Sequence, residues 1–237
     1  MLNKNLVYIA DTAPLEDGEL FERLYNSVSS ERREKIDRLR NEREKRLSLG
    51  AYVLLKKALS DIGIDSFSLE YGENGKPYLA GSSGVYFSLS HSFERVMCVL
   101  SNTEVGCDVE KVQEKSIAVA ERFFAPEEIA LIKGSEDSAD MFSRLWTLKE
   151  SFLKMTGKGM TVPLDSFCFS VSENSVNVCQ NLTKKQLFFK EYSFENDYKC
   201  SVCSYNPLFS DVIIVIFNQI TCVNAHNMRH HCMQNVQ

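Results

Sequence analysis

Two segments of the chain repeat apolar residues at the spacing of an amphipathic helix. The apolar positions of the first segment are Leu47, Ala51, Leu54 and Ala58, at intervals of 4, 3 and 4. Those of the second segment are Met141, Leu145, Leu148, Phe152 and Met155, at intervals of 4, 3, 4 and 3. Such intervals keep each set on one face of a helix. We therefore expect one helix that ends near Gly63 and another that runs from a Ser138 cap to Gly157.

Other segments have the apolar runs and alternation of strands. Phe87 and Leu89, for example, alternate with Ser88 and Ser90, as in a strand with one face in the core. The predicted strands cover residues 6–10, 85–90, 96–100, 105–109, 164–171, 186–192 and 198–205. Each half of the chain thus contains one or two helices followed by strands, which predicts an α+β fold. We place one lobe at residues 1–103, a second at 104–210 and a tail of undefined role at 211–237.

The composition is that of an ordinary soluble protein. The chain has 237 residues, of which 44% are hydrophobic and 25% are charged, and this excludes disordered, collagen-like and coiled-coil classes. Its longest apolar run, residues 212–217, is far shorter than the roughly 20 residues of a membrane span. The first ten residues lack the apolar stretch of a signal peptide. We expect a cytoplasmic protein with no membrane partner, in which the eight scattered cysteines are reduced.

Charge is unevenly distributed along the chain. The formal net charge is −5, yet residues 31–57 contain 10 Lys or Arg and 5 Asp or Glu, a net of +5, which leaves −10 elsewhere. Arg43 and Arg46 lie in this segment beside the apolar stripe of the first helix. A solvated basic face is one interpretation, and a contact for an anionic partner is the other.

Two carboxylates share one side of a predicted strand. In the segment Gly106-Cys107-Asp108-Val109-Glu110, alternation puts Cys107 and Val109 on one face, and Asp108 and Glu110 on the other. Like charges this close repel unless a cation lies between them, and Mg²⁺ prefers oxygen ligands. A hydrated acidic face is the alternative interpretation.

A further carboxylate and a lysine lie one turn apart on the second predicted helix. Glu150 is almost opposite the apolar stripe, and Lys154 follows at the i+4 position. The pair is consistent with a weakly stabilising surface ion pair. However, Phe142, Trp146 and Leu153 form a second apolar flank, which favours a groove around Glu150 over open solvent.

Two other groups of residues have candidate chemistry. Adjacent Ser90, His91 and Ser92 do not suit a serine nucleophile and its base, and their hydroxyl, imidazole and backbone N–H groups favour a phosphate contact. Cys200, Cys203, Cys222 and His226 have a spacing seen in zinc sites. Because residues three apart on a strand point to opposite faces, this spacing argues only weakly for zinc.

Taken in order, these segments resemble the 4′-phosphopantetheinyl transferases, in their larger Sfp-type branch. The matching motifs are Arg46-Leu47-Ser48-Leu49-Gly50, Gly75-Lys76-Pro77, Phe87-Ser88-Leu89-Ser90-His91-Ser92, Gly106-Cys107-Asp108-Val109-Glu110, Trp146-Thr147-Leu148-Lys149-Glu150-Ser151-Phe152-Leu153-Lys154 and Gly157-Lys158-Gly159. The resemblance extends from the first strand to about Pro207. Phe93 and Glu94 depart from the family, which often has a small residue there.

The resemblance implies a pseudo-dimer of two similar α+β lobes with coenzyme A bound between them. The metal ligands implied for Mg²⁺ are Asp108, Glu110 and Glu150. The residues implied for coenzyme A are Arg46, Lys76, Ser90, His91 and Lys149, with Lys154 as a further phosphate-neutralising lysine. Arg32 and Lys35 fall near family phosphate-binding positions, although their register relative to Arg46 is uncertain by a residue.

The implied reaction transfers 4′-phosphopantetheine from coenzyme A to a serine of an apo acyl or peptidyl carrier protein and releases 3′,5′-ADP. Glu150 is the expected general base, and Lys154 is expected to stabilise the leaving group. The resemblance also implies a monomer with no nucleic-acid partner, and it leaves open whether the carrier belongs to fatty-acid, polyketide or peptide synthesis. Two alternatives are a magnesium-dependent nuclease or phosphodiesterase and a non-catalytic module that binds coenzyme A or a carrier.

Overall fold

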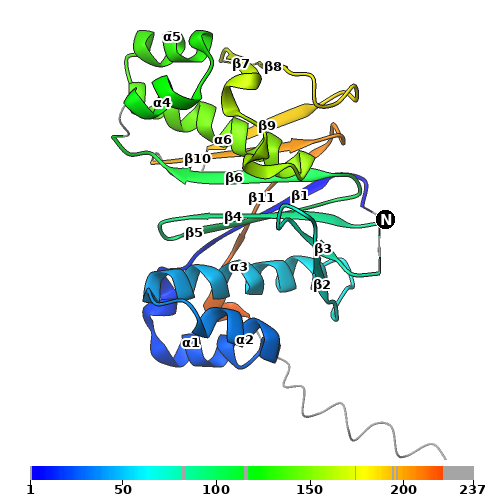
Figure 1. Ribbon diagram of the computed structural model, residues 1–237. Helices are drawn as coiled ribbons and strands as arrows, with labels where there is room; N and C mark the ends of the chain where they lie inside the picture. The colour runs from blue at the N-terminus through cyan, green and yellow to red at the C-terminus, as the bar shows by residue number, and fades with distance from the viewer. Residues whose placement is uncertain are drawn as a thin grey trace, which may run out of the picture.

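The computed structural model describes residues 2–81, 84–114, 117–173, 175–193, 195 and 197–220. Its main elements are arranged in four layers, with two sheets between two outer layers of helices (Figure 1). The first lobe contains β1 (Asn5–Asp11), η1 (Ala13–Glu16), α1 (Gly18–Tyr25), α2 (Ser30–Asp37), α3 (Glu42–Ser60), β2 (Leu69–Tyr71), β3 (Pro77–Leu79), β4 (Tyr86–Ser92) and β5 (Arg95–Ser101).

The second lobe begins with β6 (Val105–Lys111). It continues with α4 (Ile117–Phe123), α5 (Pro126–Gly134), α6 (Ser138–Thr156), η2 (Gly159–Thr161), η3 (Leu164–Ser166), β7 (Cys168–Val171), β8 (Val176–Cys179), β9 (Phe188–Ser193) and β10 (Tyr198–Ser204). The last described elements are β11 (Phe209–Val215) and η4 (Phe217–Gln219). This mixture of helices and mainly antiparallel strands confirms the α+β class expected from the sequence.

The two central sheets are built from different parts of the chain. One has the strand order β11-β1-β5-β4, and the other has the order β6-β10-β9. Three apolar clusters hold the layers together. The first lies between α3 and the first sheet, the second lies around α6, and the third joins the sheets through residues such as Val99 and Val109. Burial on both sides of each sheet accounts for the runs of apolar residues in β1 and β5.

The boundary between the second lobe and the C-terminal tail differs from the expected one at residue 211. Residues from 211 onward were assigned to a tail, but β11 pairs in parallel with β1, with Val7 opposite Val212 and Ala10 opposite Val215. Residues 211–215 therefore belong to an edge strand of the first sheet, because their backbone pairs with β1 and not with a strand of the second sheet. Cys222 and His226, which were part of the spacing considered for zinc, lie outside the described part of the chain.

The two long helices match the apolar spacing. α6 begins at Ser138, has Asp137 rather than Ser138 as its N-cap, and ends at Thr156, with Gly157 as its C-cap at φ +68°. That φ is readily accessible to glycine, so the predicted stop at this residue is confirmed. Within the described residues, no helix combines the length and apolar character needed to cross a membrane.

Candidate active site

A close approach between β6 and α6 brings the acidic strand and the polar helix together. A Cβ atom added to Gly106 would lie 2.0 Å from the carbonyl oxygen of Ser151 and 2.3 Å from the backbone nitrogen of Met155. Real Cβ atoms do not approach backbone atoms so closely, so only glycine fits at this position. On the same face of β6, Asp108 follows two residues later and faces α6.

Serine hydroxyls join the two lobes along β4 and β6. The hydroxyls of Ser88, Ser90 and Ser92 accept hydrogen bonds from the backbone N–H groups of three β6 residues. The donors are Cys107 at 3.0 Å, Val109 at 3.3 Å and Lys111 at 3.2 Å. The alternation along β4 predicted a single buried, apolar face, but the serine face is buried as well. The two-residue spacing of the serines was the signal in the sequence for this second contact.

Ser90, Asp108 and Lys154 form a hydrogen-bonded group at the junction of the lobes. The Ser90 hydroxyl donates to Asp108 Oδ1 at 2.6 Å, and Lys154 Nζ lies 2.7 Å from the same oxygen and 2.9 Å from Ser90 Oγ. The second oxygen, Asp108 Oδ2, is buried and has no hydrogen-bond partner among the described residues. A buried carboxylate oxygen without a partner is costly, which suggests that a ligand binds there.

Glu150 is held close to these charges. Burial raises the pKa of Glu150, and the negative charges of Asp108 and Glu110 raise it further, whereas Lys154 partly opposes them. Burial alone would lower the pKa of Lys154, but Asp108 and its neighbours raise it, so the lysine stays protonated. The site therefore concentrates negative charge around one ammonium group.

The three expected metal ligands are near enough to influence one another electrostatically. However, no group of three or more His, Cys, Asp or Glu side chains within the described residues is arranged to enclose a metal ion. Magnesium is commonly held by one or two carboxylates together with waters and substrate phosphates. The donor set around Asp108 Oδ2 suits that mode better than a closed protein cage.

His91 lies at the exposed side of β4, next to this group. Partial burial and the positive charge of Lys154 lower the pKa of His91. Its ring is therefore mainly neutral at pH 7, and it is able to donate one hydrogen bond to an anion. Alternation along the strand separates His91 from Ser90 and Ser92, which face β6.

Lys76 joins the turn before β3 to the second lobe. Its Nζ lies 2.8 Å from Glu104 Oε2 and donates to the carbonyl oxygens of Val105 and Met155 at 3.3 and 3.2 Å. A pocket of about 240 Å³ opens beside it between the lobes. Its lining includes Gly75, Lys76, Ser88, Leu153, Lys154 and Gly157. The structure thus brings the turn, β4 and the end of α6 to one pocket.

The expected arginines lie in the helices of the first lobe. Arg46 Nη2 forms an ion pair with Glu16 at 3.1 Å, while Arg46 Nε is buried and finds no partner in the described ranges. Arg32 donates to the backbone and hydroxyl of Ser48. Lys35 donates to the Tyr71 hydroxyl at 2.7 Å. None of these side chains belongs to the Ser90 group, so any common role requires a ligand that reaches from one region to the other.

Lys149 is not part of this region, and the phosphate contact expected for it is corrected. Its side chain is 0% exposed and lies 2.7 Å from Glu128 Oε2, whose side chain is also 0% exposed. The ammonium also donates to the carbonyl oxygens of Leu164 and Phe167 at 2.7 and 2.8 Å. All three of its protons are used inside the lobe, because residue 149 lies about 100° around the helix from residue 150. Glu128, which the sequence analysis did not single out, is the reason for this burial.

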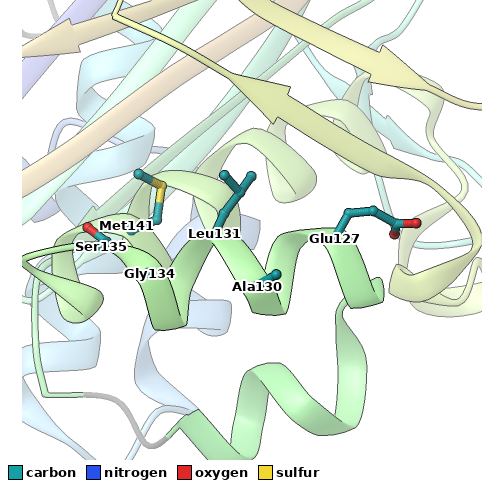
Figure 2. Close-up of a pocket in the computed structure, with 6 residues that line it drawn as sticks. All are labelled: Glu127, Ala130, Leu131, Gly134, Ser135 and Met141. Carbon is teal, nitrogen blue, oxygen red and sulfur yellow. The ribbon is translucent and has the colours of Figure 1, made fainter.

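A larger hollow of about 410 Å³ lies elsewhere, on α5 and the start of α6 (Figure 2). Its lining residues are Glu127, Ala130, Leu131, Gly134, Ser135 and Met141. Glu127 is the one ionisable side chain in this set, and in Figure 2 its carboxylate stands at one end of the groove. The groove is therefore mainly apolar, and its chemistry does not match that of the Ser90 group.

Comparisons with known proteins agree with the motifs. The profile of the 4′-phosphopantetheinyl transferase superfamily matches residues 104–203. A 4′-phosphopantetheinyl transferase of Bacillus subtilis is 33% identical over 206 residues, which cover 84% of this chain and 92% of the relative. The relative named gsp from Aneurinibacillus migulanus is 33% identical, with 83% of each chain covered. The relative named Sfp from Bacillus subtilis strain 168 is 31% identical, with 84% and 92% covered.

A solved structure of the Thermotoga maritima holo-[acyl-carrier-protein] synthase is 19% identical and covers 43% of this chain and 62% of its own, with a TM-score of 0.39. The sequence relatives are more similar to this chain and match more of its length. They extend over both lobes and include the strand and helix that carry Asp108 and Glu150. The chain therefore belongs to the 4′-phosphopantetheinyl transferase family of enzymes, in the branch that contains the Sfp-like proteins.

Proposed function

We propose that this enzyme transfers the 4′-phosphopantetheine group of coenzyme A to a serine hydroxyl of an apo acyl or peptidyl carrier protein and releases 3′,5′-ADP. The observation that carries the proposal is the Ser90, Asp108 and Lys154 group at the lobe junction, with Asp108 Oδ2 buried and unpartnered among the described residues. Glu150 lies close enough for Asp108 to raise its pKa. A phosphoryl-transfer site needs such positioning and charge stabilisation.

The residues present fit a magnesium ion. Asp108 Oδ2 is the first ligand we propose, and Glu110 and Glu150 complete the protein's share, with the diphosphate of coenzyme A as the remaining partner. When bound, Mg²⁺ supplies neutralising charge to that diphosphate. A cation at this point also relieves the repulsion among the three carboxylates.

The basic and polar side chains around the junction are proposed to hold coenzyme A. Lys76 borders the interlobe pocket. His91 lies on β4 near enough to Lys154 for the ammonium to help lower its pKa. Ser90 holds Lys154 in place at 2.9 Å, so the ammonium points toward the same region. Arg46, with its buried and unpartnered Nε in the described part of the chain, is proposed to contact the 3′-phosphate side.

Glu150 is proposed as the general base. Its carboxylate takes the proton of the attacking serine hydroxyl, directly or through one water molecule, while the oxygen attacks the β-phosphate. Its raised pKa makes it a stronger base than an ordinary glutamate. Lys154 stays protonated and stabilises the negative charge that develops on the leaving 3′,5′-ADP.

The test is a transfer assay with coenzyme A, Mg²⁺ and an apo carrier protein, followed by mass spectrometry of the carrier. We expect a gain of one phosphopantetheine group on a serine. The Asp108→Asn and Glu150→Gln variants should each lose about a thousandfold in rate, equivalent to about 4 kcal/mol. Glu121→Gln is the matched control, because Glu121 is an exposed carboxylate paired with Lys133.

Two results would contradict the proposed activity, and a third would contradict the proposed site. Hydrolysis of nucleic acid or of another phosphodiester without transfer to the carrier would favour the magnesium-dependent nuclease. Binding of coenzyme A with no transfer under any condition would favour the non-catalytic module. Full activity of the Asp108→Asn, Glu150→Gln double variant would refute the assignment of the site while leaving the transferase activity in place.

A further inference from the structure

Two cysteines face each other across the hairpin formed by β7 and β8. Cys168 and Cys179 are direct partners in the antiparallel register of these strands. Cys168 is partly exposed and Cys179 is exposed. The other free cysteines of the described residues are buried, namely Cys98, Cys107, Cys200 and Cys203. The hairpin therefore presents a pair of thiols to solvent, outside the site described above.

The register of the hairpin suits a covalent link. Residues directly opposite one another on antiparallel strands have Cα atoms about 4.5 to 5.5 Å apart. Disulfides form across Cα separations of about 4.4 to 6.8 Å. Because opposed residues point to the same face of the hairpin, both sulfurs lie on one side. We propose that Cys168 and Cys179 are a dithiol site that low-molecular-weight disulfides, such as glutathione disulfide, oxidise reversibly to an intramolecular disulfide.

The reaction has two exchange steps. The thiolate of Cys179, the more exposed of the pair, attacks one sulfur of the small disulfide, and one small thiol leaves with the electron pair of the broken S–S bond and a proton. The sulfur of Cys168 then loses its proton and attacks Cys179 in the mixed disulfide, which releases the second small thiol. The protein loses two protons and two electrons, and one small disulfide becomes two small thiols.

The order of attack agrees with the surroundings of the two sulfurs. Partial burial raises the pKa of Cys168, and the neighbouring Cys179 raises it further. Cys168 is therefore the poorer first nucleophile, since the thiolate is the reactive form. Once Cys179 carries the mixed disulfide, its sulfur is held opposite Cys168 by the strand register.

The link would fix a strand that supports the catalytic helix. On either side of Cys168, the carbonyl oxygen of Phe167 accepts a hydrogen bond from Lys149 at 2.8 Å, and the backbone N–H of Phe169 donates to Glu128 Oε1 at 2.9 Å. These groups hold the buried Glu128 and Lys149 pair, one residue before Glu150 on α6. The oxidised form is therefore expected to resist thermal unfolding of the second lobe better than the reduced form.

The test uses the full chain with Cys222→Ser and Cys232→Ser, which removes the two cysteines outside the described residues. The protein is incubated with glutathione disulfide, the remaining thiols are alkylated, and the intact protein and its peptides are analysed by mass spectrometry. We expect the oxidised protein to be about 2 Da lighter before alkylation, for two hydrogen atoms, to take up two fewer alkyl groups than the reduced protein, and to yield a linked peptide pair containing residues 168 and 179. Dithiothreitol should reverse both. In the same background, Cys168→Ser should instead keep a glutathione adduct on Cys179.

Three results would overturn the proposal. One is the absence of any reaction at either cysteine, and another is a glutathione adduct on Cys179 that persists although Cys168 is present. The third is a lower thermal midpoint for the disulfide form than for the same protein kept in dithiothreitol. Cys179→Ser is the matched control, because its thermal midpoint should not depend on the oxidant. None of these measurements requires transferase activity, so they stand apart from the test of the proposed function.

Discussion

Two ion pairs on α6 have the same length and opposite surroundings. Lys149 lies 2.7 Å from Glu128, and Lys154 lies 2.7 Å from Asp108. The side chains of the first pair are 0% exposed, whereas Lys154 is 31% exposed and Asp108 is 7% exposed. The first pair is enclosed in the second lobe, and the second pair lies where the lobes meet.

The difference lies in what each pair leaves unsatisfied. The ammonium of Lys149 has three acceptors, and both oxygens of Glu128 accept hydrogen bonds. At the second pair, Asp108 Oδ2 has no partner among the described residues, and Glu150 has a raised pKa. A fully paired buried network specifies how elements pack, whereas an incompletely paired one with excess charge marks a place for a ligand. Burial alone does not distinguish the two roles.

The largest effect on stability should come from breaking the enclosed pair. Lys149→Met leaves Glu128 charged and buried, and it should lower the free energy of unfolding by about 3 to 5 kcal/mol. Urea titration measures this loss. The double variant Glu128→Leu, Lys149→Met should recover only part of it, because it removes the unpaired buried charge but also leaves the backbone groups that this pair satisfied without partners. If the single variant loses less than about 1 kcal/mol, the pair does not hold the lobe together.

A second, smaller effect is expected in the pH dependence of the transferase activity, through the protonation of Glu150. Its pKa is raised by burial and then by Asp108, so activity should fall with decreasing pH already above the usual range of a glutamate. Saturating Mg²⁺ should move this fall to lower pH, because a cation favours the carboxylate. Initial rates measured from pH 5 to 8 at two magnesium concentrations test both points. An acidic limb that does not respond to magnesium would separate Glu150 from the metal.

The same shift predicts a change in stability with a definite sign. A carboxyl with a higher pKa in the folded chain binds its proton more tightly there, so its contribution to stability is present at low pH and is lost as pH rises through the raised pKa. Glu150→Gln should therefore raise the free energy of unfolding at pH 7. The decrease of the free energy of unfolding between acidic pH and pH 7 should also be smaller in this variant. A less stable variant at pH 7 would contradict the charge repulsion inferred for the site.

The smallest effect is expected at the rim of the proposed coenzyme A site. Arg46→Ala should raise the KM for coenzyme A about tenfold, the loss of one charge-assisted hydrogen bond, and leave kcat nearly unchanged. Its pair with the exposed Glu16 should contribute less than about 1 kcal/mol to stability. Arg38→Ala is the matched control, because Arg38 forms an exposed pair with Glu34. Equal KM values for the two variants would remove Arg46 from the site.

The sequence predicted those features that depend on local spacing. The apolar intervals predicted α6 and its stop at Gly157, and alternation in β6 placed Cys107 and Val109 in the core. The same alternation put Asp108 on the face that receives α6. The rest of the site was predicted from the order of the family motifs. No local pattern shows that Ser90 and Lys154 are in contact, because they are 64 residues apart in the sequence.

What the sequence did not predict depends on distant partners. Lys149 has a charged side chain beside Glu150, and only the position of Glu128 on α5 explains its burial. A strand with one apolar and one polar face would expose the serines of β4 to solvent, but here β6 covers them. The apolar residues of β11 are compatible with a strand in either sheet. The sequence does not show which sheet it joins, because its partner β1 lies about 200 residues earlier.

The pairing of β1 with β11 has a consequence for synthesis of the chain. Val7 leaves the ribosome early in synthesis. Its parallel partner, Val212, leaves the ribosome only after the residues of both lobes up to β10 have been made. Until then, one edge of β1 offers its backbone groups without their final partner, and such unpaired strand edges favour association with other chains. The first lobe is thus the first to be translated and the last to be completed, so nascent chains truncated before residue 209 should be the form most in need of a chaperone.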